Sequence, residues 1–162
     1  MHRGLAIAGR TRVIGLGNSV LSDDAVGLHV ARRVRDALSA WGADIDVVDV
    51  EAGGFTLFDV LQGCERAILV DAILAVGLEP GAIVRFDVAA LRGSRRLGSM
   101  HDLDLVAVLQ MGGQLGYEMP TEVVVFGIQA ADLTTFSEQL TPAVAAVVDD
   151  AVQQVIDEAA GH

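Results

Sequence analysis

The sequence predicts an α/β protein, in which a mostly parallel β-sheet with one antiparallel strand is covered by helices on both faces. Short apolar segments alternate with longer amphipathic ones, and the links between them are short. The short segments are continuous runs of Val, Ile and Leu, which is typical of strands buried on both faces. A length of 162 residues suits one domain, residues 1–162, with a core at about 12–158.

The first part of the chain is expected to alternate between strand and helix. Residues 13–16 predict a first strand that ends at Gly17-Asn18, and a helix follows from about Asp23 to Leu38. The apolar residues of this helix share one stripe: Val26, Val30, Val34 and Leu38. Residues 45–50 predict the second strand, and residues 55–61 predict a short helix.

The middle of the chain contains the clearest buried strand. The apolar run at residues 67–70 stops at Asp71, so we expect the strand to end there. The turn at residues 77–81 is too short for a parallel crossover, so the strand at residues 83–86 is predicted to be antiparallel.

The last part of the chain is expected to add two helices and one strand. After a basic loop at residues 91–98, the pattern Ser99-Met-His-Asp102 is typical of a capping box, and it predicts a helix that continues through Leu105. Residues 122–126 predict a buried strand that Gly127 ends. Thr141-Pro142 then opens a final helix to about Glu158.

Composition excludes several classes of function. The chain has 22 acidic and 11 basic side chains, a net charge of −11, and this field repels nucleic acid. No apolar run is long enough to span a bilayer, and the apolar patch at residues 5–8 is too short for a signal peptide, so we expect a cytoplasmic protein. The single cysteine, Cys64, excludes an internal disulfide and a Cys-cluster zinc site, and it is expected to be a structural thiol.

Three polar segments are expected at the carboxyl edge of the sheet, where open α/β sheets bind ligands. They are the loop at residues 17–24, Asp71 after its strand, and His101 in the first turn of its helix. Two carboxylates and an imidazole suit a divalent cation such as nickel, zinc or manganese. The helix N-terminus disfavours the imidazolium form of His101, and a metal ligand must be neutral. Three ligands also leave coordination positions open.

Each of these residues has a structural alternative. Asp23 and Asp24 could stabilise a helix N-terminus, and for Asp23 this is the better explanation. Asp71 could cap the turn after its strand, and His101 could be an exposed residue of a first turn.

Other polar residues carry weaker signals. Gly15-Leu-Gly17 lacks the third glycine of a dinucleotide-binding loop. No serine lies in a Gly-x-Ser-x-Gly elbow, and we expect Ser22 and Ser99 to be helix caps. His29 lies beside the apolar stripe and is expected to be solvated.

Three blocks of the sequence resemble the hydrogenase maturation endopeptidases. Gly15-Leu-Gly-Asn-Ser-Val-Leu-Ser-Asp-Asp-Ala-Val-Gly27 is similar to their opening signature, G-x-G-N-x-x-x-x-D-[DE]-x-x-G. Ile68-Leu-Val-Asp-Ala-Ile73 is similar to the second block, and Ser99-Met-His-Asp-Leu-Asp-Leu105 to the third, a Ser-x-His before a leucine-rich helix. Phe126-Gly-Ile128 and Leu140-Thr-Pro142 complete a resemblance that covers residues 13–158.

The resemblance implies a fold, a reaction and a set of site residues. It implies a three-layer α/β/α domain with a twisted five-stranded sheet, and an endopeptidase that removes the C-terminal extension of a nickel-iron hydrogenase large subunit after nickel insertion. It assigns Asp24, Asp71 and His101 as the catalytic and metal-binding residues. The nickel is expected to arrive within the precursor, other divalent cations can substitute for it, and the enzyme is expected to be a monomer.

Two alternatives remain open at this point. A related endopeptidase could process a substrate other than hydrogenase, and a non-catalytic domain could bind a nucleotide or another small molecule through Gly15-Leu-Gly17. The chain also departs from the family pattern in two places. It has Asp24 where Glu is also common, a difference of about one bond length in reach. It has Glu51-Ala-Gly-Gly54 where many members have an Asp-Gly-Gly-Thr-like turn.

Overall fold

The computed structural model describes residues 10–41, 45–51, 55–91 and 105–161, and these residues contain one five-stranded sheet. Its strands are β1 (Thr11–Leu16), β2 (Asp46–Val50), β3 (Arg66–Ile73), β4 (Ile83–Asp87) and β5 (Glu122–Gln129). The strand order is β2-β1-β3-β5-β4; β4 pairs antiparallel with β5, and every other pair is parallel. The predicted α/β class is therefore confirmed, including its one antiparallel strand.

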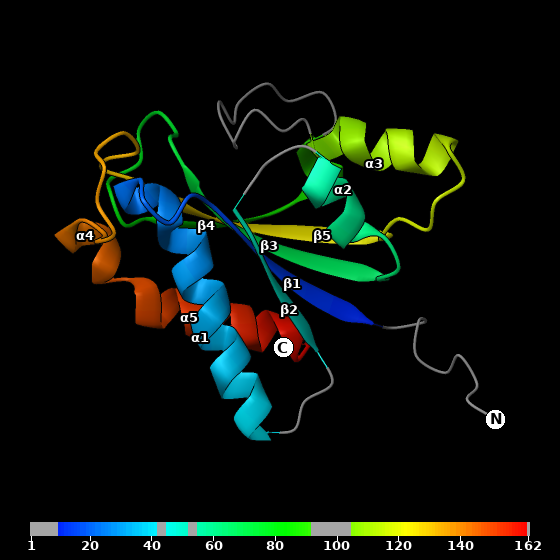
Figure 1. Cartoon of the computed structure of the whole chain (residues 1–162), viewed down its shortest axis with the longest axis horizontal. Coiled ribbons are helices and arrows are strands. Elements are labelled where there is room, and N and C mark those ends of the chain that lie inside the picture. Colours follow the sequence, from blue (N-terminus) through cyan, green and yellow to red (C-terminus); the bar gives the residue numbers. More distant parts are fainter. Residues whose placement is uncertain (1–9, 42–44, 52–54, 92–104, 162) are drawn as a thin grey trace.

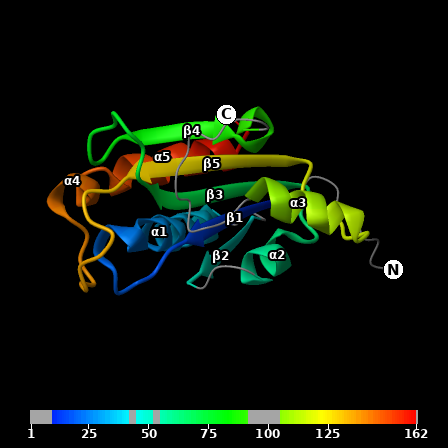
Figure 2. The same ribbon diagram turned by 90° about the horizontal axis from the view of Figure 1, so that it is seen from above.

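Helices cover both faces of the sheet (Figure 1). They are α1 (Val26–Trp41), α2 (Phe55–Leu61), α3 (Leu105–Gln114), α4 (Pro142–Ala145) and α5 (Val148–Ala159), with short 3-10 helices η1 (Ser22–Ala25) and η2 (Val88–Leu91). The helices α1 and α5 lie on one face, and α2 and α3 lie on the other (Figure 2). No helix among the described residues is long and apolar enough to cross a membrane.

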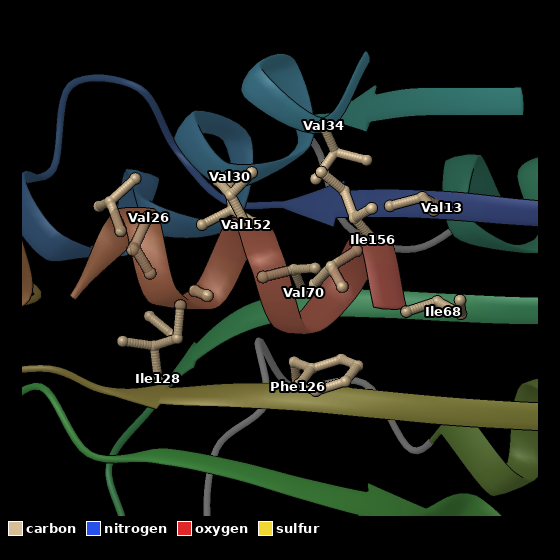
Figure 3. Close-up of a cluster of buried hydrophobic side chains, with 14 of the residues drawn as sticks. Val13, Val26, Val30, Val34, Ile68, Val70, Phe126, Ile128, Val152 and Ile156 are labelled. Carbon is tan, nitrogen blue, oxygen red and sulfur yellow. The ribbon is translucent and has the colours of Figure 1, made fainter. Parts of the chain in front are cut away.

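The core consists of two apolar clusters, one on each face of the sheet. The predicted stripe of α1 is buried in the first cluster, where α1 and α5 pack on the sheet (Figure 3). Strand β3 divides its side chains between the clusters: Val70 and its even-numbered neighbours join the first, and Leu69 and Ile73 join the second. Since side chains alternate along a strand, Asp71 points toward the face that α2 and α3 cover.

The structure corrects the predicted ends of two strands. Strand β3 continues through Asp71 to Ile73, and β5 continues through Gly127 to Gln129. The two strands pair in parallel over this whole length, with Asp71 opposite Gly127, and β4 pairs with the same part of β5. Hydrogen bonds between neighbouring strands therefore extend the ladder past a charged residue and a glycine that were expected to end it.

The predicted last helix begins at Thr141-Pro142 as expected, but it is divided into α4 and α5. Pro142 occupies the first helical turn, where its missing N–H costs nothing. The short helix α2 has the predicted bounds, residues 55–61. The predicted capping box at residues 99–102 lies outside the described residues.

Gly27 allows α1 to begin in close contact with the sheet. A Cβ atom at this position would lie 2.2 Å from the Val70 carbonyl oxygen and 2.3 Å from that of Leu16. We expect Gly27→Ala to lower the free energy of unfolding by about 1–3 kcal/mol, because backbone atoms of two strands would have to move. Urea unfolding measures this change.

Gly113 in α3 provides the control, because no atom lies within 4 Å of a Cβ built there. Gly113→Ala is expected to stabilise the protein by up to about 1 kcal/mol through helix propensity. Equal effects of the two substitutions would contradict the close packing at Gly27.

Candidate functional site

Asp24 lies at the carboxyl edge of the sheet, in the connection between β1 and α1. The connection turns at Ser22, whose φ of 49° is in the left-handed region. The Ser22 amide donates to the Ser137 carbonyl over 2.9 Å, and the Asp24 amide donates to the Leu21 carbonyl over 3.0 Å. The Asp24 side chain is buried, with 7% exposed.

The predicted role of Ser22 as a helix cap is wrong. The N-cap position of η1 is Leu21, and Ser22 lies within η1 as a buried residue. Its positive φ instead allows the chain to turn at this point. The turn places Leu21 in an isolated β-bridge with Ser137. The predicted cap at Ser99 lies outside the described residues.

Asp71 lies inside β3 and is fully buried. Its Oδ1 accepts a hydrogen bond of 2.8 Å from the amide of Ala72, the next residue in the strand. The alternative in which Asp71 caps a turn required the strand to end at this residue, and the strand continues to Ile73. A buried carboxylate inside a strand is costly to desolvate, so it must be stabilised by hydrogen bonds, by an ion pair or by a bound cation.

The elements that carry Asp24 and Asp71 contact each other. Helix η1 packs on β3, and the Gly27 backbone lies against the Val70 carbonyl, one residue before Asp71. Two buried carboxylates thus lie on contacting elements at the edge where open α/β sheets bind ligands. Carboxylate oxygens are suitable ligands for a divalent cation and suitable bases for a proton.

His101 lies outside the described residues. Within the described ranges, no group of three or more His, Cys, Asp or Glu side chains could hold a metal ion, so a third ligand would have to come from elsewhere. The sequence leads from His101 to Leu105, which begins α3 and is buried in the cluster on the face toward which Asp71 points. Helix α3 therefore begins on the same face of the sheet as Asp71.

Asp23 has a structural role that the sequence did not reveal. Its fully buried carboxylate accepts hydrogen bonds from the amides of Ala131 and Asp132, at 2.9 and 3.0 Å. It also accepts bonds from the Thr141 amide, at 2.8 Å, and from the Thr141 hydroxyl. Asp23 thus fastens the loop after β5 to η1, a larger role than the predicted stabilisation of its own helix end.

Glu51 is an exposed carboxylate at the same edge, at the end of β2. It accepts a hydrogen bond of 3.2 Å from the Ser19 amide in the loop after β1. Bonds from the Ser19 side chain and amide hold the pKa of Glu51 below its usual value. The residues that follow Glu51 in its departure from the family pattern, 52–54, lie outside the described residues.

Two other titratable groups are structural or peripheral. Cys64 is buried, its thiol donates to the Leu61 carbonyl, and burial raises the thiol pKa, so the predicted structural role is confirmed. His29 is half-buried in α1 rather than fully solvated, and desolvation followed by repulsion from Arg32 lowers its pKa.

The fold and the candidate site define a three-layer α/β protein that buries carboxylates at its ligand-binding edge. Solved structures with a similar fold include hydrogenase maturation enzymes. The hydrogenase maturating endopeptidase HybD of Escherichia coli is 25% identical, with a TM-score of 0.75 and coverage of 92% of this chain and 91% of that chain. The [NiFe] hydrogenase maturation protease HybD of Thermococcus kodakarensis is 26% identical, with a TM-score of 0.70 and coverage of 93% and 99%.

Sequence comparisons agree with the structural ones. HupD of Rhodobacter capsulatus, a hydrogenase expression/formation protein, is 28% identical over 152 residues, which cover 92% of this chain and 70% of HupD. The hydrogenase 2 maturation protease of Escherichia coli is 27% identical over 151 residues, 91% of this chain and 88% of that protein. A model of the hydrogenase maturation protease family, HycI, matches residues 24–158. The chain belongs to the hydrogenase maturation protease family, and it is an endopeptidase rather than a non-catalytic binding domain.

Proposed function

We propose that this endopeptidase removes the C-terminal extension of a nickel-iron hydrogenase large-subunit precursor after nickel insertion. We further propose that it recognises the nickel in the precursor through Asp24, Asp71 and His101. The observation that supports this most is the burial of Asp24 and Asp71 on contacting elements at the carboxyl edge, since buried carboxylates there are suited to a cation.

The proposed recognition uses nickel as part of the substrate. The metal is partly coordinated by the precursor, and the two carboxylates and the imidazole complete its coordination. Binding the metal fixes the scissile peptide against the carboxyl edge, so the reaction gains from proximity and orientation. One of the two carboxylates then takes a proton from the attacking water. When bound, nickel or another divalent cation in its place would polarise the attacking water or the scissile carbonyl.

Recognition of bound nickel also defines the partner protein. The partner is the folded large-subunit precursor rather than a short peptide, since a peptide would not present bound nickel. The enzyme acts as a monomer in the cytoplasm, and size-exclusion chromatography and cell fractionation test these two points.

The direct test compares nickel-loaded and nickel-free precursor. We expect the purified protein to shorten only the nickel-loaded form, as seen by mass spectrometry of the intact subunit. His101→Ala is expected to lower the cleavage rate by about 10²-fold or more, because a missing ligand weakens both metal recognition and peptide orientation. His29→Ala is a matched control, because His29 lies in α1, which packs on the face of the sheet opposite to the one toward which Asp71 points.

The outcomes separate the parts of the proposal. Equal cleavage of both precursor forms would refute recognition through nickel, and normal cleavage by His101→Ala would remove that residue from the site. A related endopeptidase with another substrate remains the second candidate. It predicts that no hydrogenase precursor is cleaved and that no hydrogenase structural gene lies beside the gene of this protein.

A further inference from the structure

Large apolar side chains are exposed on the loops that follow β1, β3 and β5. Val20 is 42% exposed, Leu74 is 47% exposed, Phe136 is 84% exposed, and Val76 is fully exposed. These four residues, here named the apolar rim, all lie at the carboxyl edge of the sheet, where the three loops meet in both views (Figures 1 and 2). Scattered apolar residues are normal on a protein surface, but a set gathered beside a candidate site indicates binding.

Two residues of the apolar rim lie close in the sequence to the carboxylates of the candidate site. Val20 precedes Asp24 in the connection after β1, and Leu74 follows Asp71 at the end of β3. A hydrogen bond also joins the loop after β5 to the end of β3: the Ala130 amide donates to the Ile73 carbonyl over 3.0 Å. The loops that carry the apolar rim therefore lie at the same edge of the sheet as Asp24 and Asp71, where a polypeptide with its scissile bond at the two carboxylates would approach them.

Phe136 is exposed although the backbone around it is fixed. Asp132 Oδ1 accepts hydrogen bonds from the amides of Thr134 and Thr135, at 2.9 and 3.0 Å. On the other side, the Ser137 amide donates to the Val20 carbonyl over 2.9 Å. Because the backbone that carries Phe136 is already ordered, binding of this aromatic side chain costs little backbone entropy, which suits an interface anchor.

The charged side chains within the three loops that carry the apolar rim are all acidic. Residues 17–25, 74–82 and 130–141 contain no Lys, Arg or His, whereas exposed Glu79 and Glu138 and the carboxylate of Asp132 lie among them. Hydrogen bonds from the Thr135 side chain and from the Thr134 and Thr135 amides hold the pKa of Asp132 at about 2, so this carboxylate is charged at neutral pH. These three loops therefore attract basic side chains.

We propose that the apolar rim docks the segment of the precursor polypeptide that flanks the scissile bond, and that this segment combines apolar side chains with lysine or arginine. The inference rests on the proposed endopeptidase function. A second copy of the chain is a poorer occupant, because a symmetric contact would place the acidic groups of one rim against those of the other.

The test uses the nickel-loaded precursor and the full-length double variant Val76→Ser/Phe136→Ser. Both side chains are exposed, so the variant is expected to keep the Tm of the original protein. We expect its KM for the precursor to rise by about tenfold or more, with a much smaller change in kcat, because the lost contacts bind substrate and transition state alike. Binding of the uncleaved precursor by surface plasmon resonance should weaken by a similar factor.

Leu115→Ser is the matched control, because Leu115 is 64% exposed and lies after α3, away from the carboxyl edge. We expect this substitution to leave KM unchanged. An unchanged KM and precursor affinity in the double variant would overturn the docking role, while cleavage by the original protein would leave the endopeptidase function intact. A dimer of the original protein that the double variant dissociates would assign the rim to a second copy and would also overturn the inference. If the original protein neither binds nor cleaves a hydrogenase precursor, the proposed function and this inference fail together.

Discussion

Asp71→Asn is expected to slow precursor processing strongly and to leave the fold intact. Asparagine has the shape of aspartate and keeps an oxygen that can accept the hydrogen bond from the Ala72 amide. It lacks the negative charge that a cation ligand and a base both require. We expect kcat/KM for the nickel-loaded precursor to fall by about 10²–10⁴-fold, which is the range for the loss of a general acid or base. Mass spectrometry of timed reactions measures the rate.

Asp36→Asn is the matched control for the loss of one carboxylate. Asp36 is exposed in the second half of α1, and its replacement should leave kcat/KM within about twofold, as is usual for surface substitutions remote from a site. Asp24→Asn should behave as Asp71→Asn does. Retention of more than a tenth of the activity by either variant, with the control unchanged, would exclude that carboxylate from the reaction.

The predictable part of the fold follows from local patterns. The apolar stripe of α1 could be predicted because a helix that packs on a sheet must present apolar residues at intervals of three to four residues. The antiparallel direction of β4 followed from the length of one turn, since a parallel crossover needs more residues. Its neighbour in the sheet could not be predicted in this way: β4 pairs with β5, which comes later in the chain.

The candidate site was predictable to the extent that its residues follow apolar strands. Asp24 and Asp71 are both buried, and their role as site residues stays a prediction. The predicted end of β3 was wrong, because a charged residue was expected to stop the strand. Pairing with β5 instead continues the strand through Asp71. The role of Asp23 could not be found locally, since its partners, Ala131, Asp132 and Thr141, are more than a hundred residues away in the sequence.

Asp23 is expected to be the carboxylate on which stability depends most. Its two oxygens accept hydrogen bonds from three amides and one hydroxyl of the loop after β5. Each hydrogen bond to a charged group contributes about 1.5–3 kcal/mol, and these partly buried donors recover some hydration when the carboxylate is removed. Asp23→Ala should therefore lower the free energy of unfolding by about 3–5 kcal/mol, which urea denaturation measures. Because η1 also carries Asp24, the variant should cleave the precursor more slowly even where it is folded.

Thr141→Val separates the contribution of one donor from that of the whole group. This substitution removes the hydroxyl that donates to Asp23 and keeps the amide, so it should cost about 1 kcal/mol. In the background of Asp23→Ala the same substitution should have almost no effect, because its partner is already absent. Additive losses in the double variant would show that Asp23 and Thr141 stabilise the protein independently. A loss of under about 1 kcal/mol for Asp23→Ala would contradict its role in fastening the loop after β5 to the helix that carries Asp24.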